Sequence, residues 1–107
     1  MRSTRIAWYF KSDLTFREAR DRLFALRPGK WIDRDSHYKP DSISGALPGG
    51  GNARIFKNGI GNFVVNLSVK SEDHDFEITL QKAKEELFAS VLSLLAARDA
   101  VECEPVD

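Results

Sequence analysis

The sequence predicts an α+β fold: a two-layer sandwich in which an antiparallel sheet has two helices packed on one face. Three features indicate this. Several segments alternate between apolar and other residues, two stretches have apolar residues at helical spacing, and an Asn-Gly pair separates two of the alternating segments. With 107 residues, 42% of them hydrophobic, the chain has the length and composition of a single globular domain spanning 1–107.

The chain is expected to begin with a strand and continue into a helix. Apolar residues alternate with polar or small ones over 4–11, which is the period of a strand with one buried face. Thr15 and Glu18 stand at the spacing of a capping box, in which each side chain bonds the backbone amide of the other residue. Apolar residues then recur at helical spacing until a Pro-Gly pair, so the sequence predicts a helix over 15–27.

The middle of the chain mixes an irregular segment with a hairpin. Residues 30–33 are compatible with a short strand, and 33–52 are interpreted as a surface loop because they contain few apolar residues and a run of glycines. Alternating segments then flank Asn58 and Gly59, a pair whose residues both tolerate positive φ. This predicts a β-hairpin over 53–70.

Two interpretations remain open for 76–80. Its alternation and its β-branched Ile78 and Thr79 favour a third strand of the meander, but the same residues fit the first turn of the next helix. If 76–80 is helical, the element order becomes βαββαβ, the ferredoxin-like arrangement. A wide apolar stripe predicts a helix over 81–98, and 100–106 predicts a final strand at a sheet edge.

Charge is divided unevenly along a chain whose formal net charge is zero. Residues 1–54 contain 11 basic and 6 acidic side chains, a balance of +5, whereas 55–107 contain 5 and 10, a balance of −5. The densest charge is an acidic segment that we define as Glu72, Asp73, Asp75 and Glu77. Such asymmetry indicates a charged contact surface, unless the two halves intermix their charges when they fold.

The motifs that signal phosphate or metal binding are incomplete. The glycines at 45–51 lack the lysine of a phosphate loop. Asp33, Asp35 and His37 alternate as cation ligands can, but a calcium loop would need glycine at Tyr38 and glutamate at Ser44. We therefore expect solvated turn residues there, with no metal site and no cofactor.

No catalytic constellation accompanies the single cysteine. Cys103 could pair with His37 or His74 as a nucleophile and base, but neither a glycine-flanked elbow nor an oxyanion-hole motif is present. Cys103 lies in an alternating segment, where a small hydrophobic role is the common one. We therefore expect no catalytic residues and no enzyme.

Nucleic-acid binding is the alternative hypothesis, based on the arginine-rich first half. That half supplies charge and stacking surfaces. The zero net charge and the isoelectric point of about 6.7 argue against a dedicated nucleic-acid binder. The side chains concerned are Arg17, Arg20, Arg22, Arg27, Lys30, Trp31, Arg34 and Tyr38.

Protein binding is the leading hypothesis, and two surfaces are candidates for it. One is the acidic segment. The other is in the loop 31–41, where aromatic residues are flanked by charges, as in many interface hot spots. The candidate partner-binding residues are therefore Trp31, Asp33, Asp35, His37, Tyr38, Glu72, Asp73, Asp75 and Glu77.

In its size, its single cysteine and its predicted two-layer α+β layout, the chain resembles small bacterial toxin-immunity proteins of the contact-dependent growth inhibition type. The resemblance covers the whole chain in outline and does not rest on a motif. It implies a non-enzymatic, cytoplasmic monomer that binds one toxin domain, such as a nuclease with a basic cleft, and blocks it. One cysteine fits a reducing compartment, and we expect neither a signal peptide nor a membrane span.

Overall fold

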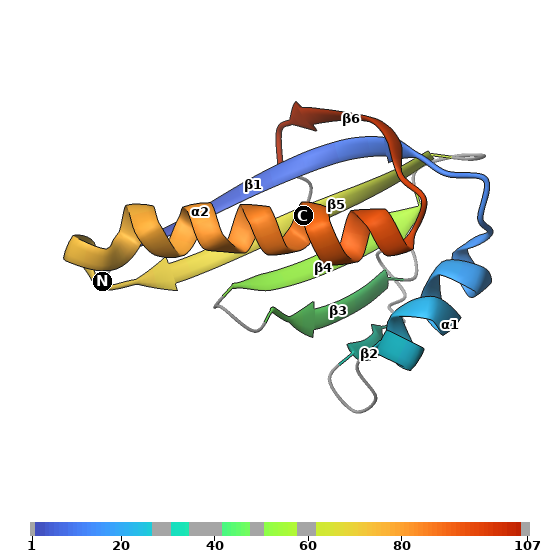
Figure 1. Ribbon diagram of the computed structural model, residues 1–107, viewed down its shortest axis with the longest axis horizontal. Helices are drawn as coiled ribbons and strands as arrows, with labels where there is room; N and C mark the ends of the chain where they lie inside the picture. The colour runs from blue at the N-terminus through green and yellow to red at the C-terminus, as the bar shows by residue number, and fades with distance from the viewer. Residues whose placement is uncertain (1, 27–30, 35–41, 48–50, 58–61, 106–107) are drawn as a thin grey trace.

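The computed structural model describes residues 2–26, 31–34, 42–47, 51–57 and 62–105, and for Trp31–Arg34 it describes the backbone alone. In this part of the chain six strands form one sheet of order β2-β3-β4-β5-β1-β6, and all neighbouring strands are antiparallel. The predicted α+β class with two helices on one face is confirmed (Figure 1). The elements in chain order are β1 (Arg2–Lys11), α1 (Phe16–Leu26), β2 (Trp31–Arg34), β3 (Ser42–Ala46), β4 (Asn52–Lys57), β5 (Asn62–Ser71), the 3₁₀ turn η1 (Asp73–Asp75), α2 (Phe76–Glu86), the π-helical segment η2 (Leu87–Leu92) and β6 (Arg98–Cys103).

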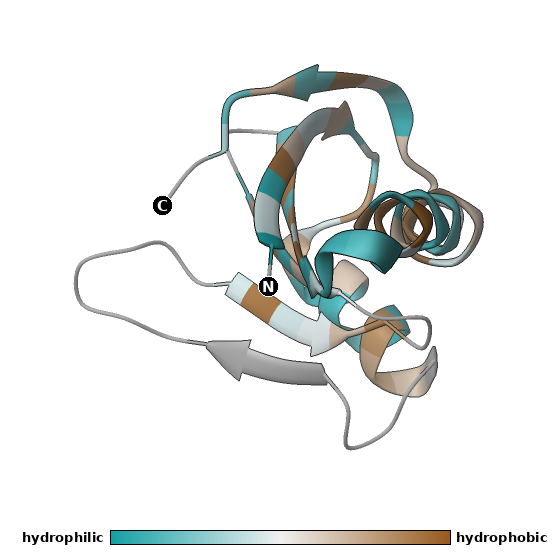
Figure 2. Ribbon diagram, turned by 90° about the vertical axis from the view of Figure 1, so that its left-hand side faces the viewer, coloured by the Kyte–Doolittle hydropathy of each residue, from teal (hydrophilic) through white to brown (hydrophobic). Residues whose placement is uncertain are grey.

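The longest strands, β1 and β5, form the middle of the sheet. They pair antiparallel over their full lengths, and the rings of Phe10 and Phe63 stack with centroids 5.4 Å apart at one end of the pair. The predicted hairpin is confirmed, because β4 pairs with β5 up to Lys57 and Phe63, although its Asn-Gly turn lies outside the described residues. Figure 2 shows the sheet curling around α2, which runs along the β1 and β5 region.

One hydrophobic cluster joins the sheet to both helices. Side chains that alternate along the strands meet the apolar stripes of α1, α2 and η2, as the sequence patterns predicted. Removal from water stabilises each such side chain by about 1.5–3 kcal/mol, so this cluster is the main source of the fold's stability. Its largest fully buried side chains are Phe10, Leu23, Ile43, Ile55, Phe63, Val65, Leu67, Val69, Leu87, Val91 and Leu95.

The predicted capping box at the start of α1 is present. The backbone amide of Thr15 donates to Glu18 Oε1 at 3.0 Å, and the amide of Glu18 donates to Thr15 Oγ1 at 3.1 Å. The hydrogen bonds from Thr15, its backbone amide first, hold the pKa of the Glu18 carboxyl below its usual value. Local sequence spacing is therefore sufficient to position this helix start.

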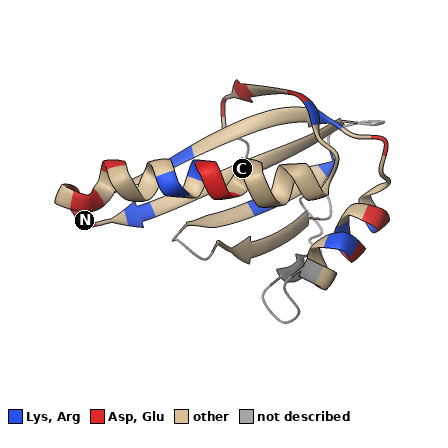
Figure 3. Cartoon of the chain, in the orientation of Figure 1, with Lys and Arg blue, Asp and Glu red and all other residues tan. Residues whose placement is uncertain are grey.

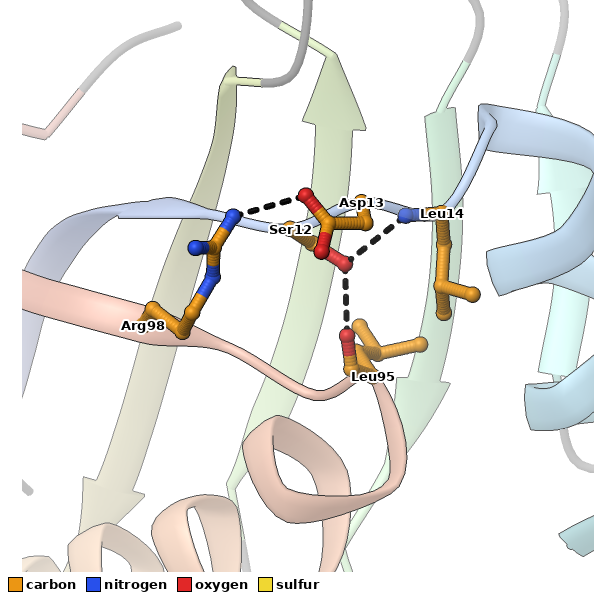
Figure 4. A network of polar contacts seen from close by, with 5 residues as sticks. All are labelled: Ser12, Asp13, Leu14, Leu95 and Arg98. Atoms are coloured by element: carbon orange, nitrogen blue, oxygen red, sulfur yellow. Dashed lines mark hydrogen bonds and ion pairs between the residues drawn. The ribbon is translucent and has the colours of Figure 1, made fainter.

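A buried serine joins the turn before α1 to the end of the last helix (Figure 4). Ser12, which is 2% exposed, donates from Oγ to the backbone carbonyl of Leu95 at 2.7 Å and accepts from the amide of Leu14 at 3.2 Å. At the surface above it, Arg98 Nη2 lies 2.7 Å from Asp13 Oδ1. We call these contacts the Ser12 junction; they tie together segments more than 80 residues apart.

The preferred interpretation of 76–80 as a strand is wrong. These residues are the first turns of α2, which begins at Phe76 rather than at 81 and whose helical continuation ends before Arg98. The segment fits both periods. Helical spacing relates Phe76, Leu80 and Ala83, whereas strand alternation relates Phe76, Ile78 and Leu80. In the structure, the residues at helical spacing face the core. Ile78 is instead 59% exposed.

The interpretation of 33–52 as one surface loop is also wrong. It contains β3, whose Ile43 is fully buried between β2 and β4, and the first residue of β4. The short strand expected at 30–33 is confirmed as β2, and the edge strand expected at 100–106 is β6. The extra strands and the antiparallel pairing of β1 with β5 exclude the ferredoxin-like βαββαβ arrangement.

Candidate functional site

The acidic segment lies in the turn that leads from β5 into α2. Glu72 follows the last residue of β5, Asp73 and Asp75 belong to η1, and Glu77 is in the first turn of α2. All four side chains are exposed. Figure 3 shows the acidic positions gathered at the start of α2, at the opposite end of the molecule from α1. The turn therefore presents a compact negative surface to solvent.

These carboxylates do not cap the helix that follows them. Asp75 occupies the N-cap position of α2 and Glu72 that of η1, yet neither side chain makes a capping hydrogen bond. The turn is closed by the backbone instead, because the amide of Asp75 donates to the carbonyl of Glu72 at 3.0 Å. Aspartate is among the best N-cap residues, so its use here without a cap leaves the carboxylate available for other contacts.

The contacts that the segment makes within the protein are at its surface. His74 Nε2 lies 3.1 Å from Asp75 Oδ2, and Arg2 Nη1 lies 3.7 Å from Glu77 Oε1, with 78% of the Glu77 side chain exposed. The Arg2 guanidinium also lies over the Phe76 ring, 4.4 Å from its centroid. Exposed ion pairs of this kind contribute little to stability. The helix macrodipole favours the negative charges by about 0.3–1 kcal/mol each.

An exposed apolar side chain borders the acidic segment. Ile78 follows Glu77 directly and is 59% exposed. Sequence reasoning missed it, because a strand over 76–80 would have placed it on the core face with Phe76 and Leu80. In protein interfaces, burial of an apolar group contributes desolvation, and neighbouring charges contribute orientation.

Of the second predicted surface, the loop 31–41, the structure describes only the backbone of Trp31–Arg34. Trp31 and Asp33 lie in β2, where their Cα partners are Gly45 and Ile43. Strand β2 is at one edge of the sheet, and Figure 1 shows it far from the start of α2. Asp35, His37 and Tyr38 lie outside the described residues. The structure thus brings the four acidic candidates together and places the backbone of Trp31 and Asp33 away from them.

The described arginines of the first half lie on several elements. Arg2 is beside Glu77, Arg17 to Arg22 are on α1, and other basic residues are on the strands. On α1, Arg22 Nη1 donates to the Leu94 carbonyl at 2.9 Å, which is a structural contact to the last helix. Arg27, Lys30 and the side chain of Arg34 lie outside the description. The described arginines of the first half are therefore spread over α1 and the strands.

Cys103 lies in the edge strand β6 beside acidic residues. Burial raises the pKa of its thiol, and the negative charges of Glu104 and Glu102 raise it further. A shallow depression of about 400 Å³ borders it, lined by Arg5, Ile6, Glu102, Cys103, Glu104 and Pro105. A raised pKa keeps the thiol protonated near neutral pH, and the protonated form is the unreactive one.

Within the described residues, His, Cys, Asp and Glu side chains form no group of three or more that could hold a metal ion. The helices described there are also too short or too polar to cross a membrane. The chain matches no protein-family model, and no curated protein sequence matches it.

Proposed function

We propose that this protein is a non-enzymatic inhibitor that binds another protein through the acidic segment and the adjoining Ile78. One observation carries the proposal: four exposed carboxylates occupy a helix-start turn, and those at its two N-cap positions make no capping bond. Local structure does not require these charges, because the backbone closes the turn without them. Their concentration at one exposed site suits recognition of a positively charged surface.

The chemistry of the segment defines the partner. Clustered negative charge raises the rate at which a basic surface is encountered, by a factor of about 10 to 10³ when both charge sets are dense. Ile78 supplies an apolar contact at the edge of the charges. The charges orient the partner but do not provide such a contact. A partner with a basic cleft beside an apolar depression fits both features.

The proposed partner is a toxin domain with such a cleft, for example a nuclease whose cleft binds nucleic-acid phosphates. Occupation of the cleft by the acidic segment would exclude the substrate, since both are negative. The small α+β chain with one cysteine supports this assignment through its resemblance to toxin-immunity proteins. We propose a one-to-one complex that forms in the cytoplasm.

The test uses as partner the protein encoded by the adjacent reading frame, which the proposal requires to be a toxin domain. Isothermal titration should give a one-to-one complex with the unchanged chain, and co-expression should restore growth of cells that make the toxin domain. The variant E72Q/D73N/D75N, which removes three charges while keeping side-chain size, should weaken the complex at least tenfold, about 1.4 kcal/mol, and should lose growth rescue.

A matched variant controls for net charge. E85Q/E102Q/E104Q also removes three exposed carboxylates, but from α2 beyond its first turns and from the region of β6. It should bind and rescue like the unchanged chain. The absence of a complex, or equal weakening by the two variants, would overturn the proposal; binding to single-stranded nucleic acid that weakens steeply with salt would replace it with the alternative function.

A further inference from the structure

A second polar region lies on the face of the sheet opposite the helices. Residues that alternate with the core side chains point to this outer face, as Arg5 does before Ile6 and Arg54 before Ile55. Here six side chains surround a depression of about 210 Å³. They are Arg5, Ser44, Asn52, Arg54, Asn66 and Ser68.

Strand register explains why the depression forms at this place. Asn66 of β5 is opposite Arg54 on one side and Ala7 on the other, and Ser44 of β3 is opposite Arg54. The neighbouring row places Ser68 between Asn52 and Arg5. Small side chains therefore form the floor, with Arg54 between Ser44 and Asn66 in one row and Arg5 beside Ser68 in the next.

The floor is built from buried polar groups. Ser44 and Asn66 are each 4% exposed, and both make polar interactions within the protein. A buried polar group that is bonded in place has a fixed orientation, which is the property that a small binding site requires. Arg5 also interacts with other groups of the protein, and it lines a second depression together with Glu102 and Glu104.

Arg54 has donors left over. Its side chain is half-buried, and its Nε donates to Ser42 Oγ at 3.0 Å, which fixes the plane of the guanidinium. Among the described residues no carboxylate lies within ion-pair distance of it, and none lines the depression. Partial desolvation and the remaining N–H donors of the Arg54 guanidinium favour the binding of an anion.

We propose that this depression is an oxyanion site that binds a phosphoryl group, as free phosphate or as a phosphomonoester. Arginine presents paired donors that match phosphate oxygens, while the amide of Asn52 and the hydroxyl of Ser68 add uncharged donors. The depression is smaller than the roughly 300–1,000 Å³ of drug-sized ligand sites, so the phosphoryl group itself is the recognised part. The site is independent of the acidic segment.

The experiment titrates inorganic phosphate into ¹⁵N-labelled protein at constant ionic strength, with chloride as the reference salt. The backbone amides of Ser44, Asn66 and Ser68 should shift and saturate. R54Q should weaken the affinity about tenfold, because a charged donor pair is lost. R54K, which keeps the charge but not the paired donors, should bind with intermediate affinity.

R17Q is the matched control, because Arg17 is an exposed arginine on α1, away from the outer face. It should leave the phosphate affinity unchanged. A nucleoside 5′-monophosphate that binds more tightly than phosphate would indicate an ester as ligand, whereas equal affinity would indicate free phosphate. Shifts that never saturate, or equal affinities of the unchanged protein, R54K and R54Q, would overturn the proposal.

Discussion

The two turns that lead from a strand into a helix use their polar side chains in opposite ways. In the turn between β1 and α1, Ser12, Asp13 and Thr15 all bond to other groups of the protein. In the turn between β5 and α2, the backbone makes the closing bond, and the carboxylates of Glu72 and Asp73 stand in solvent. The two turns have similar residue types but different surroundings.

This difference separates polar groups that hold the fold from polar groups that are free to bind. Ser12 is buried, and its hydrogen bond to the Leu95 carbonyl satisfies a buried backbone group. The acidic segment is exposed, so its charges add little to stability. Substitutions in the first turn should therefore change folding, and substitutions in the second should change association.

The largest effect on stability is expected for Ser12→Ala. It leaves the Leu95 carbonyl and the Leu14 amide without their partner, which should lower the free energy of unfolding by about 1–3 kcal/mol. Urea denaturation measures this change. Asp13→Asn is the neighbouring control, because its exposed contact with Arg98 should be worth no more than about 1 kcal/mol. If the two substitutions lowered the free energy of unfolding equally, the buried bonds of Ser12 would not be more stabilising than the exposed contact of Asp13.

A smaller loss is expected when the capping box of α1 is broken. Thr15→Ala removes the acceptor of the Glu18 amide and should cost about 1 kcal/mol in urea denaturation. At the corresponding position before α2, Asp75→Ala should cost less, because Asp75 makes no capping bond. A greater loss for Asp75→Ala would show that its carboxylate supports the helix after all.

The neutral variant E72Q/D73N/D75N should fold almost as stably as the unchanged chain. Loss of the interaction with the helix macrodipole is opposed by relief of repulsion among the carboxylates, so the net change should stay within about 1 kcal/mol. Thermal and urea unfolding check this result. A larger loss of stability would mean that the charges support the fold. Weakened binding by this variant would then result from unfolding and not from a lost contact with the partner.

The smallest effect is the pH dependence of the Glu18 contact. Because the pKa of Glu18 is lowered by folding from its ordinary 4.5, its ionised form stabilises the protein above that value and ceases to do so as pH falls through the lowered pKa. The difference in stability between the unchanged chain and Glu18→Gln should therefore shrink on acidification. Urea midpoints across an acidic pH series measure it, and a constant difference would contradict the assignment.

Sequence patterns predicted the structural features that depend on residues close together in the chain. The spacing of Thr15 and Glu18 was sufficient for the capping box, and the alternation in β1 and β5 was sufficient for the centre of the sheet. Residues 76–80 satisfy both helical and strand periods, so their pattern could not decide between the two. The continuous apolar stripe into α2 and η2 decides for the helix.

Features that depend on distant residues were not predictable. Strand β3 contains one large apolar residue, Ile43, and it is a strand because it pairs with β4 and β2. The partner of Ser12 is 83 residues away, and no local pattern indicates that contact. The outer-face depression likewise needs the register of β1, β3, β4 and β5, which brings Arg5 and Arg54 to one place. For the candidate site, composition identified the acidic segment, but the lack of capping bonds and the exposure of Ile78 required the structure.

The most direct test of docking through the acidic segment is the rate of association with the toxin domain across a salt series, measured by stopped flow. For the unchanged chain the rate constant should fall steeply as salt rises, because screening shortens the reach of the charges. E72Q/D73N/D75N should associate at least about tenfold more slowly at low salt and depend weakly on salt. Equal rates and equal salt dependence for the two proteins would contradict the account.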